Sequence, residues 1–400
     1  MLSGAPDFQP LVGSYLARQE WAQAVPARDG ARPVGSAQAV TEVVDVELLR
    51  DELPGLASVV AVAGGQTFHL VLGWREVATA PGVLGSRPNA VVGPANDGRS
   101  DVLVYDALAD GDLVLELLTA ASEGREHAGR GRVVQSRLSH SALIYDDRLF
   151  MKCYRIIEPG SRPEIETMQR LDAVGFNHML APVALWNRGG RDLALVREFI
   201  PGAIEGRALA LTSLRDLMAR AESGEGGTAF ENLGLAGGDL GPEMRRLGQT
   251  TAAMHLALAE AFGRSSDGRI RVHGDYHLRR VMRSDAGWIV AGFGDDPLLG
   301  ADAGTASTGD PVMATPIEDL ADLCYSLRRV ALEVTVLQPP STRLHSMALA
   351  AGWEHHNVRE FVRGYRSVPE VGALVALEDD GLETTLTAMT DARAATALPA

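Results

Sequence analysis

The chain has 400 residues, of which 46% are hydrophobic and 22% charged, and its formal net charge is −15 at pH 7. This composition is typical of a globular protein of two or three domains, and it excludes non-specific binding to nucleic acid or to an anionic membrane, because both would repel the chain. The two cysteines, Cys153 and Cys324, are too few for a disulfide framework.

The localisation expected from the sequence is cytoplasmic. We find no apolar run of the ~18 residues that a membrane span needs. The first residues, Met1 to Asp7, also lack the basic and apolar regions of a signal peptide. The richness in Ala, Gly, Arg and Val is typical of a high-GC, actinobacterial-like genome.

Residues 1–130 predict a mixed α/β region. Two apolar runs flank Gly64 and Gly65, a turn signal that indicates a hairpin. The hairpin comprises residues 58–63 and 67–72. Residues 81–100 are rich in Gly, Pro, Asn and Asp and predict a long loop, whereas 102–118 has leucines at spacings of seven and three and is predicted to be partly helical. The Gly- and Arg-rich connector 124–131 marks a domain boundary.

The rest of the chain predicts a short strand-rich part followed by helices. Strands are expected at 141–145, 149–154 and 193–199, helices with Pro163 in the first turn, over 211–218, over 247–262 and from Pro316, and loops at 223–241 and 296–315. Ser161 with Glu164, and Thr315 with Glu318, have the spacing of helix capping boxes.

The segment 272–277 reads Val-His-Gly-Asp-Tyr-His and precedes an apolar strand at 288–291. An Asp in such a loop can orient a sugar hydroxyl and accept its proton during phosphoryl transfer. A zinc site at His273 and His277 is disfavoured, because Gly274 indicates a loop and no third ligand is evident.

Lys152 is the second position that carries chemistry. On its strand it shares a face with Phe150 and Tyr154. A Lys so placed can hold nucleotide phosphates, paired with a Glu of the next helix, here Glu164 or Glu166. Most strand lysines are solvated, but the 272–277 motif downstream favours the phosphate-binding interpretation.

These motifs together resemble the maltokinases, within the aminoglycoside-phosphotransferase-like family. The matching segments are 152–166, 198–202, 247–259, 272–278 and 353–365, with a faint match at 18–21. The resemblance implies an α+β, protein-kinase-like two-lobed fold: an N-terminal mixed α/β cap with its connector (1–130), a small β-rich N-lobe (131–202), and a helical C-lobe with the catalytic loop (203–400).

The resemblance also implies roles for individual residues and a cofactor, ATP with Mg²⁺. Asp275 would be the catalytic carboxylate, and His273 and His277 would hold the loop. The residues implied in nucleotide binding are Lys152, Glu166, Ser139, Ser141, Glu198 and Ile200, and those implied in contacting a sugar or amino-sugar acceptor are Tyr276, Trp353 and Glu354.

The chain departs from the family at the metal ligands. Arg280 stands where the family has Gln or Asn, and Gly292 stands where it has a metal-binding Asp. An Arg cannot ligate Mg²⁺. Because Mg²⁺ neutralises charge on the transferred phosphoryl group, losing its site should raise the activation barrier by several kcal/mol. Asp295 or Asp296 could supply replacement ligands, although solvated turn residues are the more ordinary interpretation, or Arg280 could take over part of the role of the metal.

Two further segments differ from the family. Ser139-His140-Ser141 replaces the usual Ser-Asn-Thr of the phosphate loop, and the segment after Pro369 lacks the aromatic residues and Lys that contact sugar, so that maltose recognition is not expected. Three hypotheses follow. The chain is an ATP-dependent kinase of a sugar or amino sugar, a pseudokinase with a regulatory or scaffolding role on a carbohydrate enzyme, or an aminoglycoside-type antibiotic phosphotransferase.

Overall fold

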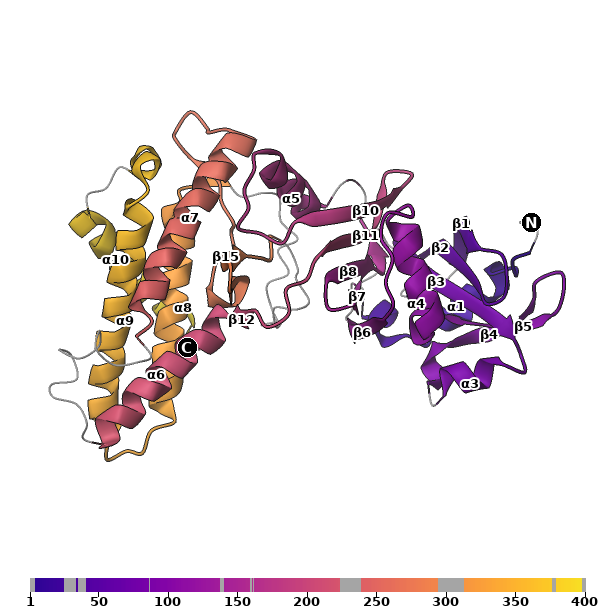
Figure 1. The fold of residues 1–400 in the computed structure, drawn as a ribbon, viewed down its shortest axis with the longest axis horizontal. Coiled ribbons are helices and arrows are strands. Elements are labelled where there is room, and N and C mark those ends of the chain that lie inside the picture. Colours follow the sequence, from indigo (N-terminus) through magenta and orange to yellow (C-terminus); the bar gives the residue numbers. More distant parts are fainter. Residues whose placement is uncertain are drawn as a thin grey trace. The chain divides into compact units, whose positions relative to one another are not determined.

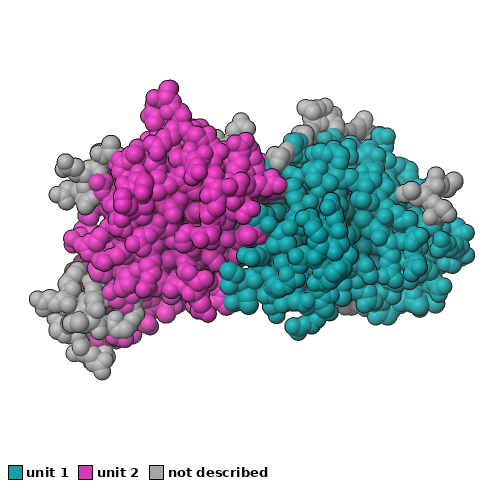
Figure 2. Space-filling model, turned by 45° about the horizontal axis from the view of Figure 1, so that its top comes forward, with its two compact units in different colours: residues 1–162, 182–201 teal, residues 163–181, 202–400 magenta. Residues whose placement is uncertain are grey.

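The structure is a computed structural model. It describes residues 4–24, 34, 41–85, 87–136, 140–158, 160, 162–223, 239–293, 313–375 and 379–397. The chain forms two compact units, coloured separately in Figure 2. Unit 1 contains residues 1–162 and 182–201, and unit 2 contains residues 163–181 and 202–400.

The first sheet of unit 1 is antiparallel, with strand order β1-β2-β3-β5-β4 and with β9 added to β3. Its strands are β1 (Thr41–Arg50), β2 (Gly55–Ala63), β3 (Gln66–Glu76), β4 (Val91–Asn96), β5 (Asp101–Asp106) and β9 (Ile156–Ile157). Gly64 and Gly65 join β2 to β3 with φ of 60° and 74°, a conformation that glycine adopts without steric cost. The predicted hairpin is therefore confirmed.

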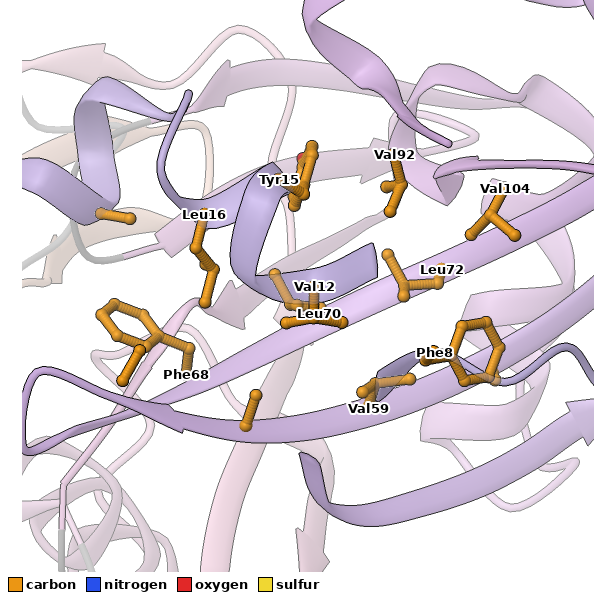
Figure 3. Close-up of a cluster of buried hydrophobic side chains, with 14 of the residues drawn as sticks. Phe8, Val12, Tyr15, Leu16, Val59, Phe68, Leu70, Leu72, Val92 and Val104 are labelled. Atoms are coloured by element: carbon orange, nitrogen blue, oxygen red, sulfur yellow. The ribbon is translucent and has the colours of Figure 1, made fainter. Parts of the chain in front are cut away.

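The short helices of unit 1 accompany this sheet. They are α1 (Gln9–Leu16), α2 (Glu20–Gln23), α3 (Ala80–Leu84), α4 (Gly111–Ala121) and the 3₁₀ helices η1 (Pro88–Ala90) and η2 (Ala107–Ala109). Val12, Tyr15 and Leu16 of α1 pack on Leu70 and Leu72 of β3, in the apolar cluster of Figure 3. This burial fixes α1 against the sheet.

One expectation for this region is wrong and another is confirmed in part. The predicted long loop 81–100 contains most of α3, η1 and β4. The segment 102–118, predicted to be partly helical, begins as β5, whose Val102 and Val104 are fully buried at the strand spacing of two. The helix α4 begins only after Asp110, whose side chain accepts the backbone N–H of Asp112 at 3.1 Å and caps it.

The second sheet of unit 1 has strand order β10-β11-β8-β7-β6. Its strands are β6 (Gly131–Ser136), β7 (His140–Tyr145), β8 (Leu149–Tyr154), β10 (Pro182–Arg188) and β11 (Arg191–Glu198), which confirms the three strands expected here. Every residue of β7 and β8 is buried, so both faces of these strands are covered. Directly after β8, the backbone carbonyl of Arg155 accepts from His69 of β3 at 2.9 Å, which links the two sheets.

Unit 2 is mainly helical (Figure 1). Its helices are α5 (Pro163–Ala173), α6 (Gly206–Ser223), α7 (Gly241–Phe262), α8 (Ile317–Val336), α9 (Arg343–Arg366), α10 (Asp379–Ala397) and the 3₁₀ helix η4 (Pro369–Ala373), and all the predicted helices are among them. At Gly248 of α7, a Cβ atom would lie 2.1 Å from the carbonyl oxygen of Phe361 in α9. The two helix backbones therefore approach at a distance that only glycine permits.

The predicted helix starts are only partly confirmed. α8 begins one residue after the expected Pro316, no side chain caps it, and Thr315 contributes its backbone carbonyl, 3.0 Å from the N–H of Glu318. The predicted Thr315 cap is therefore wrong, because Pro316 and not Thr315 occupies the N-cap position. Ser161, most of the predicted loop 223–241 and nearly all of 296–315 lie outside the described residues.

Two small antiparallel sheets complete unit 2. The strands β12 (Ile204–Glu205), β14 (Val281–Ser284) and β15 (Gly287–Val290) form one, and β13 (Ile270–Arg271) and β16 (Met313–Ala314) form the other. The segment 272–277 lies between β13 and the 3₁₀ helix η3 (Leu278–Arg280). None of the helices in the described part of the chain is long and apolar enough to cross a membrane.

Candidate active site

The segment 272–277, here called the Asp275 loop, is held by a carboxylate of the helical core. Asp319 in the first turn of α8 is fully buried, and it accepts the backbone N–H groups of His273 at 2.8 Å and Gly274 at 2.9 Å. Burial by itself would raise the pKa of Asp319, but His255, His273 and the N–H of Gly274 hold it below its usual value. The loop is therefore attached to an anionic side chain.

The two histidines of the motif make contacts within the Asp275 loop and its flanks. His273 bonds the carbonyl oxygen of Ala291 through Nε2 at 3.2 Å, and its Nδ1 accepts the N–H of Asp275 at 3.3 Å. The Nδ1 atom of His277 accepts the N–H of Arg279 at 3.2 Å. Burial lowers the pKa of His273. Both histidines therefore contact the backbone of this loop or its flanks, and the structural role expected for them stays a prediction.

The carboxylate of Asp275 faces Arg280. Nε and Nη2 of Arg280 lie 3.0 Å and 2.5 Å from the same oxygen, Oδ2. The other oxygen, Oδ1, has a weaker contact with Nε2 of His277 at 3.4 Å. Burial would raise the pKa of Asp275, but His277 and Arg280 together lower it to about 2. Asp275 is therefore an anion at neutral pH, with Oδ1 less engaged than Oδ2.

Gly292 leaves the space that the Arg280 side chain fills. A Cβ atom at Gly292 would lie 2.7 Å from Cδ and 2.8 Å from Nη1 of Arg280, and its φ of +79° also favours glycine. The two departures from the resembled family therefore belong to one local arrangement. Asp295 and Asp296, the alternative metal ligands, lie outside the described residues.

The described residues of this loop do not fit Mg²⁺. The groups in contact with the Asp275 carboxylate are the guanidinium of Arg280 and the imidazole of His277, and Gly292 lies beside that guanidinium. Mg²⁺ prefers an octahedron of oxygen ligands, and a guanidinium repels a divalent cation and donates no lone pair. In the ranges that the structure describes, no group of three or more His, Cys, Asp or Glu side chains could hold a metal ion.

Lys152 lies in the middle of β8 and is only 5% exposed, so the solvated interpretation of this residue is wrong. Its Nζ atom lies 5.4 Å from the ring centroid of Tyr154. In the register of the sheet Leu195 is opposite Lys152 and Arg197 is opposite Phe150, and the Arg197 guanidinium lies 4.5 Å from the Phe150 ring centroid. One face of this sheet therefore carries two cations among aromatic rings.

Ser141, expected to contact nucleotide, makes a hydrogen bond with Arg155 within unit 1. It is fully buried, and its Oγ accepts from Nε of Arg155 at 2.8 Å. Arg155 also pairs with Asp106 at 3.2 Å and lies 4.6 Å from the ring of Trp21. The hydroxyl of Ser141 thus has a fixed protein partner, and Ser139 lies outside the described residues.

The other residues expected at the nucleotide belong to both units. Glu198 ends β11 and is exposed, and Ile200 follows it half-buried. Glu166 belongs to α5 of unit 2, where its carboxylate lies 2.9 Å from Arg170 and 3.8 Å from Arg271. Within unit 2 Glu166 is therefore a partner of two arginines.

The residues expected at the acceptor need a correction. Tyr276 is fully buried with its hydroxyl 2.8 Å from Thr251 Oγ1, and Trp353 is 2% exposed and donates to Ser213 at 3.1 Å. Neither presents surface to a sugar, so packing replaces the expected substrate contact. Glu354 accepts from Arg328 at 2.9 Å, and burial raises its pKa.

Sequence reasoning missed Asp319 and His255. Asp319 lies four and eight residues before Leu323 and Leu327, on the buried face of α8. A carboxylate on an apolar helix face needs buried partners, and that was the available signal. His255 is likewise within the buried stretch of α7.

Comparison with known proteins supports the fold. No protein-family model matches the chain. Among solved structures, a glucosamine kinase in complex with glucosamine, ADP and inorganic phosphate has a TM-score of 0.52 and 19% identity, covering 94% of this chain and 92% of its own. A second crystal form of glucosamine kinase has a TM-score of 0.54 and 19% identity, covering 97% and 93%. The expected α+β, kinase-like fold with a β-rich N-terminal part and a helical C-terminal part is therefore confirmed.

Proposed function

We propose that the chain is an ATP-dependent phosphotransferase whose acceptor is a hydroxyl group of a sugar or amino sugar, in the maltokinase-like branch. The observation that carries the proposal is the Asp275 carboxylate, anionic and held on a loop that Asp319 fixes through two backbone N–H groups. The similarity in fold to a glucosamine kinase crystallised with glucosamine and ADP supports it.

In this proposal Asp275 orients the acceptor. The less engaged oxygen Oδ1 accepts a hydrogen bond from the acceptor hydroxyl. As that hydroxyl oxygen bonds to the γ-phosphorus of ATP, the bond to ADP breaks and the proton passes to the carboxylate. A pKa of about 2 makes Asp275 a weak base, so its main contribution is orientation. The buried Lys152 is the proposed phosphate ligand, and the backbone near Glu198 and Ile200 the proposed adenine contact.

A second function, that of a pseudokinase, is favoured by the same loop. Arg280 occupies Oδ2 of Asp275, and the described residues offer no magnesium site. A chain of this kind would act through a bound carbohydrate enzyme and not through turnover. The two functions differ in whether Asp275 is needed for a chemical step.

The experiment is an ADP-release assay on wild type, Asp275→Asn and the control Asp267→Asn, whose side chain is exposed. The acceptor panel contains glucosamine, glucose, maltose and aminoglycosides, each with ATP and with or without MgCl₂. We expect acceptor-dependent ADP release with a monosaccharide, reduced about 100-fold or more by Asp275→Asn and unchanged by the control. ATP binding without acceptor-dependent release would instead establish the pseudokinase, and release with aminoglycosides alone would establish the antibiotic phosphotransferase.

A further inference from the structure

We propose that Arg280 takes the place of a divalent cation at the Asp275 loop, so that this loop binds nucleotide phosphate without a metal, and that Gly292 is the residue that makes this possible. The inference rests on the proposed function in taking the anion to be a nucleotide phosphate. It starts from the disagreement between the expected Mg²⁺ site and the residues present.

The Arg280 side chain fills the space beside Gly292. The Arg280 side chain is 12% exposed, and its Cδ, Nη1 and Cζ atoms lie within 3.2 Å of the position that a Cβ at Gly292 would take. Real Cβ atoms do not approach other atoms to 2.7 Å, and the backbone at Gly292 has a positive φ. Any side chain at 292 would thus displace the guanidinium, which makes the two residues a matched pair.

Arg280 also balances the negative charge of Asp275. Asp275 needs a positive charge beside it, because a half-buried carboxylate without one is costly. Arg280 supplies this charge permanently, since a guanidinium does not lose its proton in proteins. A cation that the chain itself holds thus performs what a bound metal ion would otherwise perform for Asp275.

Arg280 keeps N–H donors that Asp275 does not use. A guanidinium has five N–H groups, of which Asp275 uses one on Nε and one on Nη2. Within the described residues Nη1 donates no hydrogen bond, and it lies beside Gly292. Planar guanidinium groups bind phosphate oxygens with charge-assisted hydrogen bonds. Arg280 can therefore contact Asp275 and a phosphate oxygen at once.

Arg280 is preorganised for binding an anion. The backbone of Arg280 is fixed at both polar groups, because its N–H donates to His277 at 2.7 Å and its carbonyl accepts from Ala291 at 2.8 Å. The side chain is then held by Asp275. Little conformational freedom is left to lose when an anion binds, which compensates in part for a charge of +1 in place of +2.

The test is calorimetric titration of ADP into the full chain, in EDTA and again in MgCl₂. The variants are Arg280→Gln, the double variant Arg280→Gln with Gly292→Asp, and the control Arg269→Gln, whose side chain is exposed. We expect the wild-type and control Kd values to change less than twofold with Mg²⁺. Arg280→Gln should weaken ADP binding at least tenfold in EDTA, and the double variant should regain affinity only when Mg²⁺ is present.

The possible outcomes separate this inference from the proposed function. ADP binding that is at least tenfold tighter with Mg²⁺ in the wild type would overturn the inference and leave the phosphotransferase intact. Absence of ADP binding under both conditions would overturn both. An Arg280→Gln variant that binds ADP as the wild type does would remove Arg280 from the site.

A stability experiment tests the matched pair without nucleotide. Gly292→Ala is introduced into the wild type and into Arg280→Ala, and urea unfolding midpoints are measured. We expect a larger loss in the wild type, since only there does the new methyl group meet the guanidinium. Equal losses in the two backgrounds would show that backbone strain alone acts at 292 and would overturn the pairing.

Arg280→Lys, which keeps the charge, replaces Arg280→Gln in the ADP titration if Arg280→Gln does not fold.

Discussion

Asp319 and His255 pair in the interior of unit 2, with 3.1 Å between Oδ2 and Nε2 and with both side chains fully buried. The other ring nitrogen of His255 bonds the hydroxyl of Tyr365 at 3.0 Å. Asp319 thereby connects α7, α8 and α9 to the backbone of the Asp275 loop. The position of the candidate catalytic carboxylate is consequently set by the packing of the helical core.

We expect Asp319→Asn to lower the free energy of unfolding by about 3 kcal/mol, the range for removing one partner of a buried charged network. An amide in place of one carboxylate oxygen would direct N–H groups at the donors of His273 or Gly274. Urea unfolding measures the loss. Asp267→Asn, on an exposed residue, should leave the unfolding free energy nearly unchanged, and equal effects of the two variants would contradict the role of Asp319.

The contact of α7 with α9 predicts a second stability effect. At Gly248 a Cβ would lie 2.1 Å from the carbonyl oxygen of Phe361, and at Gly364 it would lie 1.9 Å from that of Arg245. Gly248→Ala and Gly364→Ala should each destabilise by about 2 kcal/mol or more, because the helices must separate. Gly381→Ala is the matched control, since that helical position is open. It should be neutral or stabilise by up to about 1 kcal/mol. Thermal unfolding of the three variants tests this.

The sequence predicted most of the helices and strands, because their apolar spacing is regular. The helix α7 and the strand pair β7–β8 follow such patterns. The segment 102–118 shows the limit. Its leucines have helical spacing only after Gly111, and the alternation of Val102 and Val104 on β5 indicates a strand. The prediction of a long loop at 81–100 was wrong because the segment contains β4, a short edge strand with a Gly and a Pro. Its pairing with β5 is a tertiary contact that the local sequence does not reveal.

The site was predictable only in part. The motif pointed to Asp275, His273 and His277 through its resemblance to a catalytic loop, and their roles stay a prediction. It could not show that Arg280 turns back onto Asp275, because that contact depends on side-chain conformation and on the space at Gly292. The place of Asp319 on an apolar helix face signalled buried partners, but not which ones, since those depend on how α8 packs under the loop.

His69 predicts a pH dependence of stability in unit 1. It is fully buried between Ser58 Oγ and the carbonyl oxygen of Tyr154, at 3.0 Å from each, and burial lowers its pKa to about 4. The unfolded chain, with a His pKa of about 6.5, therefore binds a proton first as the pH falls. Stability is complete above about pH 6.5 and declines between about 6.5 and 4, by up to about 3 kcal/mol from this group.

Urea unfolding at pH 7, 6, 5 and 4.5 checks this decline. His69→Gln should be less stable than the wild type at pH 7, and it should lose less stability on acidification. The control is His345→Gln, since His345 is exposed and should leave the pH slope unchanged. Parallel slopes in the wild type and His69→Gln would assign the acid sensitivity to other groups.

Arg280→Gln should raise the pKa of Asp275 above its value of about 2, because the charge and two hydrogen bonds of the guanidinium are lost while the burial remains. The carboxyl ¹³C shift of Asp275, followed by NMR between pH 2 and 7, reports this pKa directly. The folded-state pKa of the wild type lies below the unfolded value of about 3.9. Asp275 therefore contributes stability that is complete above about pH 4 and is lost as the pH falls towards 2. In Arg280→Gln this contribution should shrink, and an unchanged titration would show that His277 alone holds the carboxylate ionised.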